Sequence, residues 1–271
     1  MANDTEQAKA RARATYDAAS DRYDDAANSF WGRFGAATVE RLGLRAGDSV
    51  LDVCCGTGAS ALPAAERVGP SGHVLGIDLA ERLLELARRK AAAGGLRNCE
   101  FRVGDMLDLR ISDRFDAVVC VFGVFFVPDI AAAVRSLAAR VKPGGLLAIT
   151  TWGPRFFEPA TFAFWESIRA ERPDLFKGFN PWDRICDPTS LGALLAEAGV
   201  DDATVTAESG FHAIDSPDAW WSAVMGSGYR GTVDQLTEEQ RARVRKSNDD
   251  FVKRHAVHAV KANVVYAVAR L

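Results

Sequence analysis

The sequence predicts an α/β protein built on a parallel sheet, and two observations lead to this fold class. From residue 49 on, short apolar segments alternate with helix-like segments over about 100 residues, which is typical of βαβ units. The run AVVCVFGVFFV at 117–127 is continuously apolar, as expected of a strand covered on both faces. At 271 residues, the chain suits one large domain or one domain with insertions.

Five strands and three helices are predicted in the first part of this alternation. The strands are short, apolar and rich in valine, and they lie at 49–54, 73–78, 99–105, 115–123 and 146–152. The helices show apolar residues at helical spacing and lie at 59–68, 80–93 and 130–141. Each helix is followed by glycine or proline, the last by KPGG at 142–145.

The later part of the chain continues the alternation less regularly. A helix is predicted at 187–200, where Asp187 can cap the start, Pro188 suits the first turn and Gly199 can end it. Strands are predicted at 203–214 and 262–271. Two insertions, at about 153–186 and 215–260, interrupt the pattern, and helices are predicted inside the second at 216–224 and 237–255. Thr237 and Gln240 form the pattern of a capping box at the start of the last helix.

Composition and charge argue against several classes of partner. Lys and Arg total 33 and Asp and Glu total 36, so the net charge of −3 favours neither nucleic acid nor an anionic membrane as a partner. The N-terminal segment lacks the apolar core of a signal peptide, and the longest apolar run is shorter than the ~20 residues of a membrane span. We therefore expect a cytoplasmic protein with a small-molecule substrate. The oligomeric state is left open, with a homodimer as the assembly considered.

Five cysteines, at 54, 55, 99, 120 and 186, raise the question of a redox or metal site. Their number is odd and their spacing is not that of a zinc site, so free thiols and no metal are expected. Adjacent cysteines such as Cys54 and Cys55 rarely form a disulfide with each other, because the geometry is strained. We interpret this pair as small residues at a strand end.

The segment CCGTGAS at 54–60 predicts a ligand loop at the carboxyl edge of the sheet. Gly56 and Gly58 would let a ligand approach the backbone, and the helix that follows favours an anionic group. Asp78 ends the second strand, where a carboxylate can accept hydrogen bonds from ribose hydroxyls. These features alone fit either a dinucleotide or another adenosine cofactor.

Three further features favour an adenosine cofactor other than a dinucleotide. Asp52 places a carboxylate beside the loop, where it suits a cationic amine and repels a pyrophosphate. The acidic turn GDM at 104–106 follows the third strand and can hydrogen-bond an adenine amine. KPGG at 142–145 then leads into the fifth strand.

On these motifs, the sequence resembles the class I S-adenosylmethionine-dependent methyltransferases, in the small-molecule branch near the ubiquinone-biosynthesis type. The similar segments are VLDVCCGTG, VLGIDLA, GDMLDL, FDAVVCVFGVFFVPD and LAARVKPGG, and the resemblance covers about residues 15–152. It implies a Rossmann-like, seven-stranded, mostly parallel sheet with helices on both faces and an antiparallel last strand. One departure is Cys54, which stands where the family often has its first glycine.

The resemblance also implies a domain plan and a set of cofactor contacts. Residues 1–45 would form a helical lid, and residues 46–271 a methyltransferase domain whose insertions build a helical and aromatic cap. The residues expected to contact S-adenosylmethionine are Tyr16, Tyr23, Asp52, Cys54, Gly56, Thr57, Gly58, Asp78, Leu79, Asp105, Met106, Val121 and Phe122. Tyr16 and Tyr23 are seven residues apart, so we expect them near one face of the lid helix, where either could bond the cofactor's carboxylate.

The aromatic residues of the insertions favour a small, largely apolar or aromatic acceptor over a protein or nucleic acid. A helix containing residues 161–171 would place Glu166 on one face with Phe162 and Arg169, and apolar surroundings there would raise its pKa and make it a base. An exposed Glu166 paired with Arg169 is the alternative. His212 is the next candidate base. Two other classes stay open: an NAD(P)-dependent oxidoreductase and a non-catalytic cofactor-binding subunit.

Overall fold

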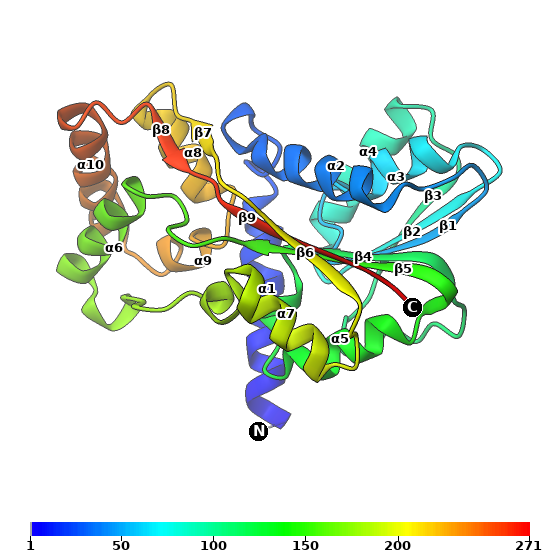
Figure 1. The fold of residues 1–271 in the computed structure, drawn as a ribbon. Coiled ribbons are helices and arrows are strands. Elements are labelled where there is room, and N and C mark those ends of the chain that lie inside the picture. The colour runs from blue at the N-terminus through cyan, green and yellow to red at the C-terminus, as the bar shows by residue number, and fades with distance from the viewer. Residues whose placement is uncertain (1) are drawn as a thin grey trace. The chain divides into compact units, whose positions relative to one another are not determined.

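In the computed structural model, which describes residues 2–271, the chain divides into a sheet unit and a helical unit (Figure 1). The sheet unit comprises residues 31–153, 181–208 and 264–271. The helical unit comprises the residues up to Phe30 together with 154–180 and 209–263, which overlap the two predicted insertions.

The sheet unit contains a seven-stranded sheet in the order β3-β2-β1-β4-β5-β9-β6. Its strands are β1 Ser49–Val53, β2 His73–Asp78, β3 Cys99–Val103, β4 Phe115–Val121, β5 Val141–Trp152, β6 Ala203–Glu208 and β9 Val264–Arg270. The first five run parallel, and β9 is antiparallel to both of its neighbours, β5 and β6. The predicted mostly parallel sheet with an antiparallel last strand is confirmed.

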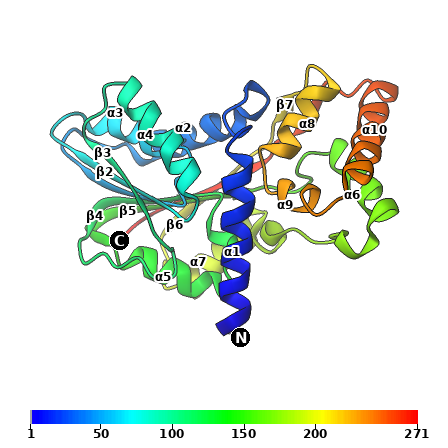
Figure 2. The same ribbon diagram turned by 180° about the vertical axis from the view of Figure 1, so that it is seen from behind.

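Helices cover both faces of this sheet. They are α2 Phe30–Leu42, α3 Ala61–Val68, α4 Glu81–Ala93, α5 Ile130–Ala138 and α7 Pro188–Glu197. The first three lie on one face and the last two on the other (Figures 1 and 2). Strands β1 and β4 are buried almost throughout, as two-sided cover requires, and α3 buries Ala61, Ala64, Ala65 and Val68 at helical spacing.

The predicted cap of α7 is present in the structure. The Asp187 carboxylate accepts from the backbone N–H of Thr189 and Ser190, Pro188 occupies the first turn, and Gly199 follows the helix with φ of 78°. Such a left-handed residue just past a helix end favours glycine. These local signals position α7 against β6 and β9.

Two predicted boundaries are wrong. The helix expected at 130–141 ends at Ala138, because buried Val141 already pairs with Phe115 and residues 142–145 bulge from β5 before Leu146 pairs with Ala117. The strand expected at 203–214 is two strands, β6 and β7 Phe211–Ala213, in different sheets. The break falls at Gly210, whose N–H donates to Asn263 Oδ1 at 3.1 Å and whose carbonyl accepts from Ala262 N.

The helical unit packs its helices around a buried polar residue. Its elements are α1 Ala2–Ala19, α6 Ala160–Glu171, β7, α8 Pro217–Met225, α9 Arg230–Val233, α10 Glu238–Arg254 and β8 Ala259–Lys261. Asn248 of α10 accepts from Trp220 Nε1 at 2.9 Å and donates to Ser167 Oγ at 3.0 Å, which joins α10 to α8 and α6. The predicted capping box of Thr237 and Gln240 is present at the start of α10.

None of the helices within residues 2–271 has both the length and the apolar character needed to cross a membrane.

Candidate cofactor site

The loop after β1 turns sharply at three residues with left-handed backbone conformation. The φ angles are 62° at Cys54, 53° at Gly56 and 85° at Gly58. Glycine adopts this region without penalty, whereas a residue with a Cβ loses roughly 1–2 kcal/mol. The conformation explains why the family often has glycine at the position of Cys54, and it shows that this chain accepts strain there.

Asp78, at the end of β2, is bonded to this loop. Its Oδ2 accepts from the backbone N–H of Gly56 at 2.9 Å, and its Oδ1 accepts from Ala80 N at 2.9 Å. The two amides therefore set the orientation of the carboxylate. An ionised carboxylate only accepts hydrogen bonds, and its two oxygens together offer about four lone-pair positions. The position of Asp78 therefore suits it to accept hydrogen bonds from two neighbouring hydroxyls of a ligand at the strand ends.

Asp52, the last but one residue of β1, is buried beneath the same loop. Its Oδ2 accepts from Ser60 Oγ at 2.7 Å, while its Oδ1 has no hydrogen-bond partner among the described residues. The pKa of Asp52 is raised to about 7, chiefly by burial and also by the charge of nearby Asp78, against the opposing effect of the Ser60 bond. A cationic or hydrogen-bond-donating ligand group would satisfy Oδ1. The orphaned oxygen is therefore the clearest ligand-directed feature of the loop.

We expect Asp52→Asn to change how the stability of the cofactor-free protein depends on pH. Folding raises the pKa of Asp52 from 3.8 to about 7, so the protonated carboxyl favours the folded state. This contribution is complete below the unfolded pKa and is lost as the pH rises through the folded pKa. Between pH 5 and pH 8, the free energy of unfolding measured with urea should fall by more than ~1 kcal/mol further in the wild type than in Asp52→Asn. Equal pH slopes for the two proteins would contradict this assignment, and Asp202→Asn, on the surface, serves as the control.

Two neighbouring helices support the loop from outside. Lys90 Nζ of α4 donates to Thr57 Oγ1 at 2.9 Å, and Thr57 is buried. Gly35 of α2 lies so close that an added Cβ would be 2.3 Å from Ala59 O and 2.9 Å from Ser60 N. The contacts of Gly35, Ser60 and Lys90 at this loop were not predicted from the sequence. Only Ser60 carried a local signal, because it is the last residue of the loop segment 54–60.

The turn after β3 positions the next predicted residues. The Asp105 carboxylate accepts from Leu107 N at 2.8 Å, which makes a tight Asx turn, and Met106 is buried. Leu79, next to Asp78, is half-buried. The ends of β1, β2 and β3 thus bring Asp52, Asp78 and Asp105 to one edge of the sheet.

Phe122 follows Val121, the last residue of β4, and also has a left-handed backbone, with φ of 55°. Its ring stacks on Trp152 with centroids 3.8 Å apart and planes 8° apart, and Trp31 and Phe34 of α2 pack at 5.7 and 5.9 Å. Strained bulky residues of this kind cluster at functional sites. The aromatic packing holds Phe122 at the end of β4, the strand next to β1 and its glycine loop.

The cysteines of the described chain are free thiols. The neighbouring Cys120 thiol, together with burial, raises the pKa of the Cys54 thiol. Burial chiefly raises the pKa of Cys55. Within residues 2–271, no three His, Cys, Asp or Glu side chains are grouped so that they could hold a metal ion.

We expect Cys54→Ala and Cys55→Ser each to keep most of the activity, with a stability loss of ~1 kcal/mol where a buried group is removed. The reason is that both thiols are protonated and packed, and that the loop offers its backbone to a ligand. Activity of the purified variants and their thermal melting temperatures test this. Activity lost with a chelator and restored by zinc would contradict it.

Four predicted residues, Tyr16, Tyr23, Glu166 and His212, belong to the helical unit rather than to the sheet unit that carries the glycine loop. Tyr16 and Tyr23 were expected on one helix, and this is wrong, because α1 ends at Ala19 and the chain then turns. Their rings nevertheless meet edge to face, 6.4 Å apart.

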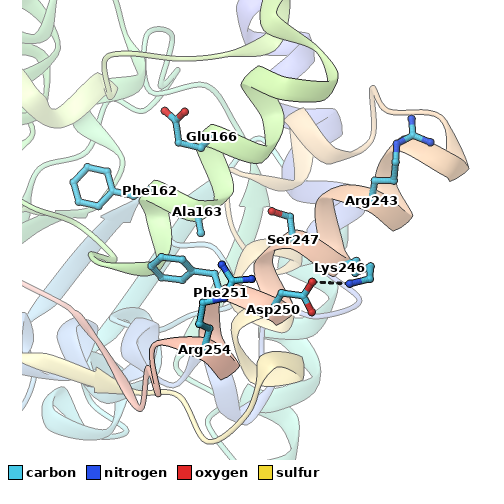
Figure 3. Close-up of a pocket in the computed structure, with 9 residues that line it drawn as sticks. All are labelled: Phe162, Ala163, Glu166, Arg243, Lys246, Ser247, Asp250, Phe251 and Arg254. Carbon is cyan, nitrogen blue, oxygen red and sulfur yellow. Dashed lines mark hydrogen bonds and ion pairs between the residues drawn. The ribbon is translucent and has the colours of Figure 1, made fainter.

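Of the two alternatives predicted for Glu166, the structure shows the exposed side chain paired with Arg169 and not the base in apolar surroundings. Its side chain is 63% exposed, and its Oε1 lies 2.9 Å from Arg169 Nη1. It lines a groove of about 480 Å³ between α6 and α10, together with Phe162, Ala163 and six residues of α10 (Figure 3). Helical periodicity had correctly grouped Glu166 with Arg169, but it cannot tell whether the shared face is buried. His212, on β7, bonds through Nε2 to the carbonyl of Ala27 at 2.8 Å, and its ring meets the Phe30 ring edge to face.

Comparison with known proteins agrees with this geometry. A family model described as "Methyltransferase domain" matches residues 50–145. A demethylmenaquinone methyltransferase of Halalkalibacterium halodurans is 31% identical over 185 residues, which is 64% of this chain and 76% of that protein. A demethylmenaquinone methyltransferase of Listeria monocytogenes is 39% identical over 112 residues, 41% of this chain, and the match spans only 47% of that relative's length.

Solved structures share the fold at lower identity. An S-adenosylmethionine-dependent methyltransferase from Thiobacillus denitrificans has a TM-score of 0.55 at 23% identity, covering 88% of this chain and 91% of that one. The cyclase SpnF has a TM-score of 0.52 at 20% identity, covering 88% and 80%.

The chain belongs to the class I S-adenosylmethionine-dependent methyltransferases, and within them to the small-molecule branch. Two relatives, at 31% and 39% identity, are demethylmenaquinone methyltransferases. The predicted family, its fold and its cofactor are confirmed. An NAD(P)-dependent oxidoreductase, the rival enzyme class, is not favoured.

Proposed function

We propose that this protein transfers the methyl group of S-adenosylmethionine to a small, largely apolar or aromatic acceptor. The observation that carries the proposal is the buried Oδ1 of Asp52, which has no hydrogen-bond partner among the described residues and suits a cationic amine. The bond between Asp78 Oδ2 and Gly56 N adds a ribose-type carboxylate at the same loop. Family membership supports the same conclusion.

The residues present fit the cofactor. In the proposal, the backbone of Cys54, Gly56, Thr57 and Gly58 admits the methionine end, and the orphaned Oδ1 of Asp52 takes its ammonium group. Asp78 accepts from the ribose hydroxyls. Leu79, Asp105 and Met106 surround the adenine, and Val121 and Phe122 border the methionine end. Tyr16 and Tyr23 are the proposed contacts of the cofactor's carboxylate.

The acceptor that we propose is a quinol-type aromatic ring. The Halalkalibacterium relative is named for demethylmenaquinone, a naphthoquinone. That name supports a planar, apolar substrate here. In this proposal, a cap from the insertions at about 153–186 and 215–260 and a lid of residues 1–45 would exclude water from such a substrate.

When bound, S-adenosylmethionine supplies an electrophilic methyl group, which an acceptor attacks in line. The chain's task is then mainly to position the acceptor, and positioning can lower a barrier by ~7–11 kcal/mol. A dry site also helps, because the sulfonium charge disappears during transfer. A base is needed only if the acceptor must lose a proton.

Glu166 and His212 are the two candidate bases. Because Glu166 is exposed and paired with Arg169, we expect Glu166→Gln to leave turnover within a few-fold of wild type. Steady-state kinetics across pH, with cofactor affinity measured alongside, test this. A fall of ~10²-fold with intact affinity would instead establish Glu166 as a base.

Calorimetry tests the proposal against its rivals. We expect S-adenosylmethionine and S-adenosylhomocysteine to bind and NADH not to bind. Binding of NADH alone would overturn the proposal. A non-catalytic subunit needs a separate test, because the fold also occurs in a protein named as a cyclase. Binding without methyl transfer to any acceptor would favour that alternative.

The proposal includes a cytoplasmic location, a role in secondary metabolism and no nucleic-acid partner. Cell fractionation tests the first, and light scattering distinguishes a homodimer from a monomer.

A further inference from the structure

The switch point of the sheet lies between β1 and β4, because the chain runs outward from β1 to β3 and returns on the other side of β1. Open α/β sheets bind ligands outside the carboxyl ends of the strands at this point. The glycine loop follows β1, and the segment FGVFFV at 122–127 follows β4. This second loop therefore borders the proposed cofactor site on the side away from β2 and β3.

The exposed large apolar side chains of the sheet unit gather at the same edge. Among the described residues of that unit they are Val103 at 51%, Phe126 at 42% and Leu107 at 41% exposure. Apolar side chains scattered singly over a surface need no explanation. Val103 is the last residue of β3, Leu107 follows β3, and Phe126 follows β4, so all three lie at or just after the carboxyl end of a strand. Val103 and Leu107 adjoin the proposed adenine contacts, whereas Phe126 lies beyond the proposed methionine end.

Phe126 has a buried aromatic support. Phe125, its neighbour in the 3-10 turn η2 Val124–Phe126, is buried, with ring centroids 4.8 Å apart. The Phe125 ring meets the Trp182 ring at 5.4 Å, and Trp182 belongs to the turn η4 Pro181–Ile185, which packs against η2. Phe125 thus anchors the turn inward while Phe126 points outward.

The chemistry of this loop selects one kind of ligand. Residues 122–127 carry no charged or polar side chain, and the nearby Asp129 is engaged as the N-cap of α5, accepting from Ala132 N at 2.8 Å. An exposed phenyl ring attracts another ring in an offset or edge-to-face arrangement. A neutral planar ring suits this surface better than a charged or sugar-like acceptor.

We propose that Phe126, supported by Phe125 and Trp182, is the wall on which the acceptor's aromatic ring packs, and that it determines acceptor selectivity. This inference rests on the proposed function, and it assigns the acceptor a place at the β4 side of the switch point. Val103 and Leu107 then serve the adenine side of the same edge.

The test measures binding of reduced 1,4-naphthoquinol by anaerobic equilibrium dialysis, with S-adenosylhomocysteine present so that no turnover occurs. We expect Phe126→Ala to weaken naphthoquinol binding by ~10-fold or more, and Phe126→Tyr to remain within about 3-fold of wild type. Phe211→Ala is the matched control, since Phe211 is 60% exposed and lies in the helical unit. Affinity for S-adenosylhomocysteine should be unchanged in all three variants.

Three results would overturn the inference. They are no naphthoquinol binding by the wild type, equal binding by Phe126→Ala, and loss of S-adenosylhomocysteine affinity in Phe126→Ala. The failure of the proposed function is a different result: naphthoquinol bound as expected, yet no methylated product with S-adenosylmethionine.

Discussion

Replacing Asp78 with alanine is expected to weaken S-adenosylmethionine binding by ~10- to 150-fold, which corresponds to the 1.5–3 kcal/mol of hydrogen bonds to a charged group. Two effects combine. The variant loses the acceptor for the ribose hydroxyls, and the N–H of Gly56 loses its partner at 2.9 Å. The glycine loop should therefore become less ordered in the cofactor-free protein. Calorimetric titration measures the affinity, and amide hydrogen exchange at residues 54–58 measures the loop.

Asp78→Asn separates these effects. Asparagine keeps the shape and one accepting oxygen, but its amide nitrogen would face either Gly56 N or Ala80 N, both of which are donors. We expect a loss close to that of Asp78→Ala. Asp202→Ala, on the surface after α7, controls for a general change of charge. An Asp78→Ala affinity within 2-fold of wild type would show that Asp78 does not hold the cofactor.

Replacing Gly35 with alanine should both destabilise the protein and weaken cofactor binding. The new Cβ would lie 2.3 Å from Ala59 O and 2.5 Å from Ala59 C, and these are backbone atoms that cannot rotate away. Either α2 or the glycine loop must shift. Such overpacking costs ~1–3 kcal/mol of folding stability. A loop displaced from its cofactor geometry should also lose ~10-fold or more in affinity.

The same helix offers a control in which the expected change in folding stability has the opposite sign. Gly32 of α2 has nothing within 4 Å of its added Cβ. Gly32→Ala should therefore raise stability by ~0.5–1 kcal/mol, because alanine favours a helix over glycine. Urea unfolding and calorimetry on both variants test the pair. Similar stability and affinity in Gly35→Ala and Gly32→Ala would refute close packing of α2 on the loop.

The sequence predicted the sheet well because its signals are local. The apolar run at 73–78 and the length of that run correctly placed Asp78 at a strand end. A capping pattern correctly identified Asp187 as the cap of α7. The contacts that brace the loop were not predicted, since Gly35 and Lys90 are far from it in sequence and no local pattern marks them. The prediction of a single strand at 203–214 was wrong because β-propensity continues across Gly210. There, hydrogen bonds to residues 262 and 263 redirect the chain.

The helical unit was harder to predict from the sequence than the sheet unit. Periodicity identified the face that Glu166 shares with Arg169, but burial depends on what packs against a face. The buried Asn248 gave no sequence signal, because a polar residue in a charged helix is indistinguishable from a solvated one until its partners Trp220 and Ser167 are known. Cys54 was interpreted as a small residue chosen for fit. The structure adds that its backbone is left-handed and that the neighbouring Cys120 thiol and burial raise its pKa.

The most direct test of the central claim is the mass of the acceptor after incubation with S-adenosylmethionine that carries a trideuterated methyl group. With reduced 1,4-naphthoquinol under anaerobic conditions, the product should gain one trideuteromethyl group in place of a hydrogen. S-adenosylhomocysteine should form in equal amount, and Asp78→Ala should lower the yield at limiting cofactor. A protein that binds S-adenosylmethionine yet transfers no label to naphthoquinol or to any other small aromatic acceptor would contradict the account.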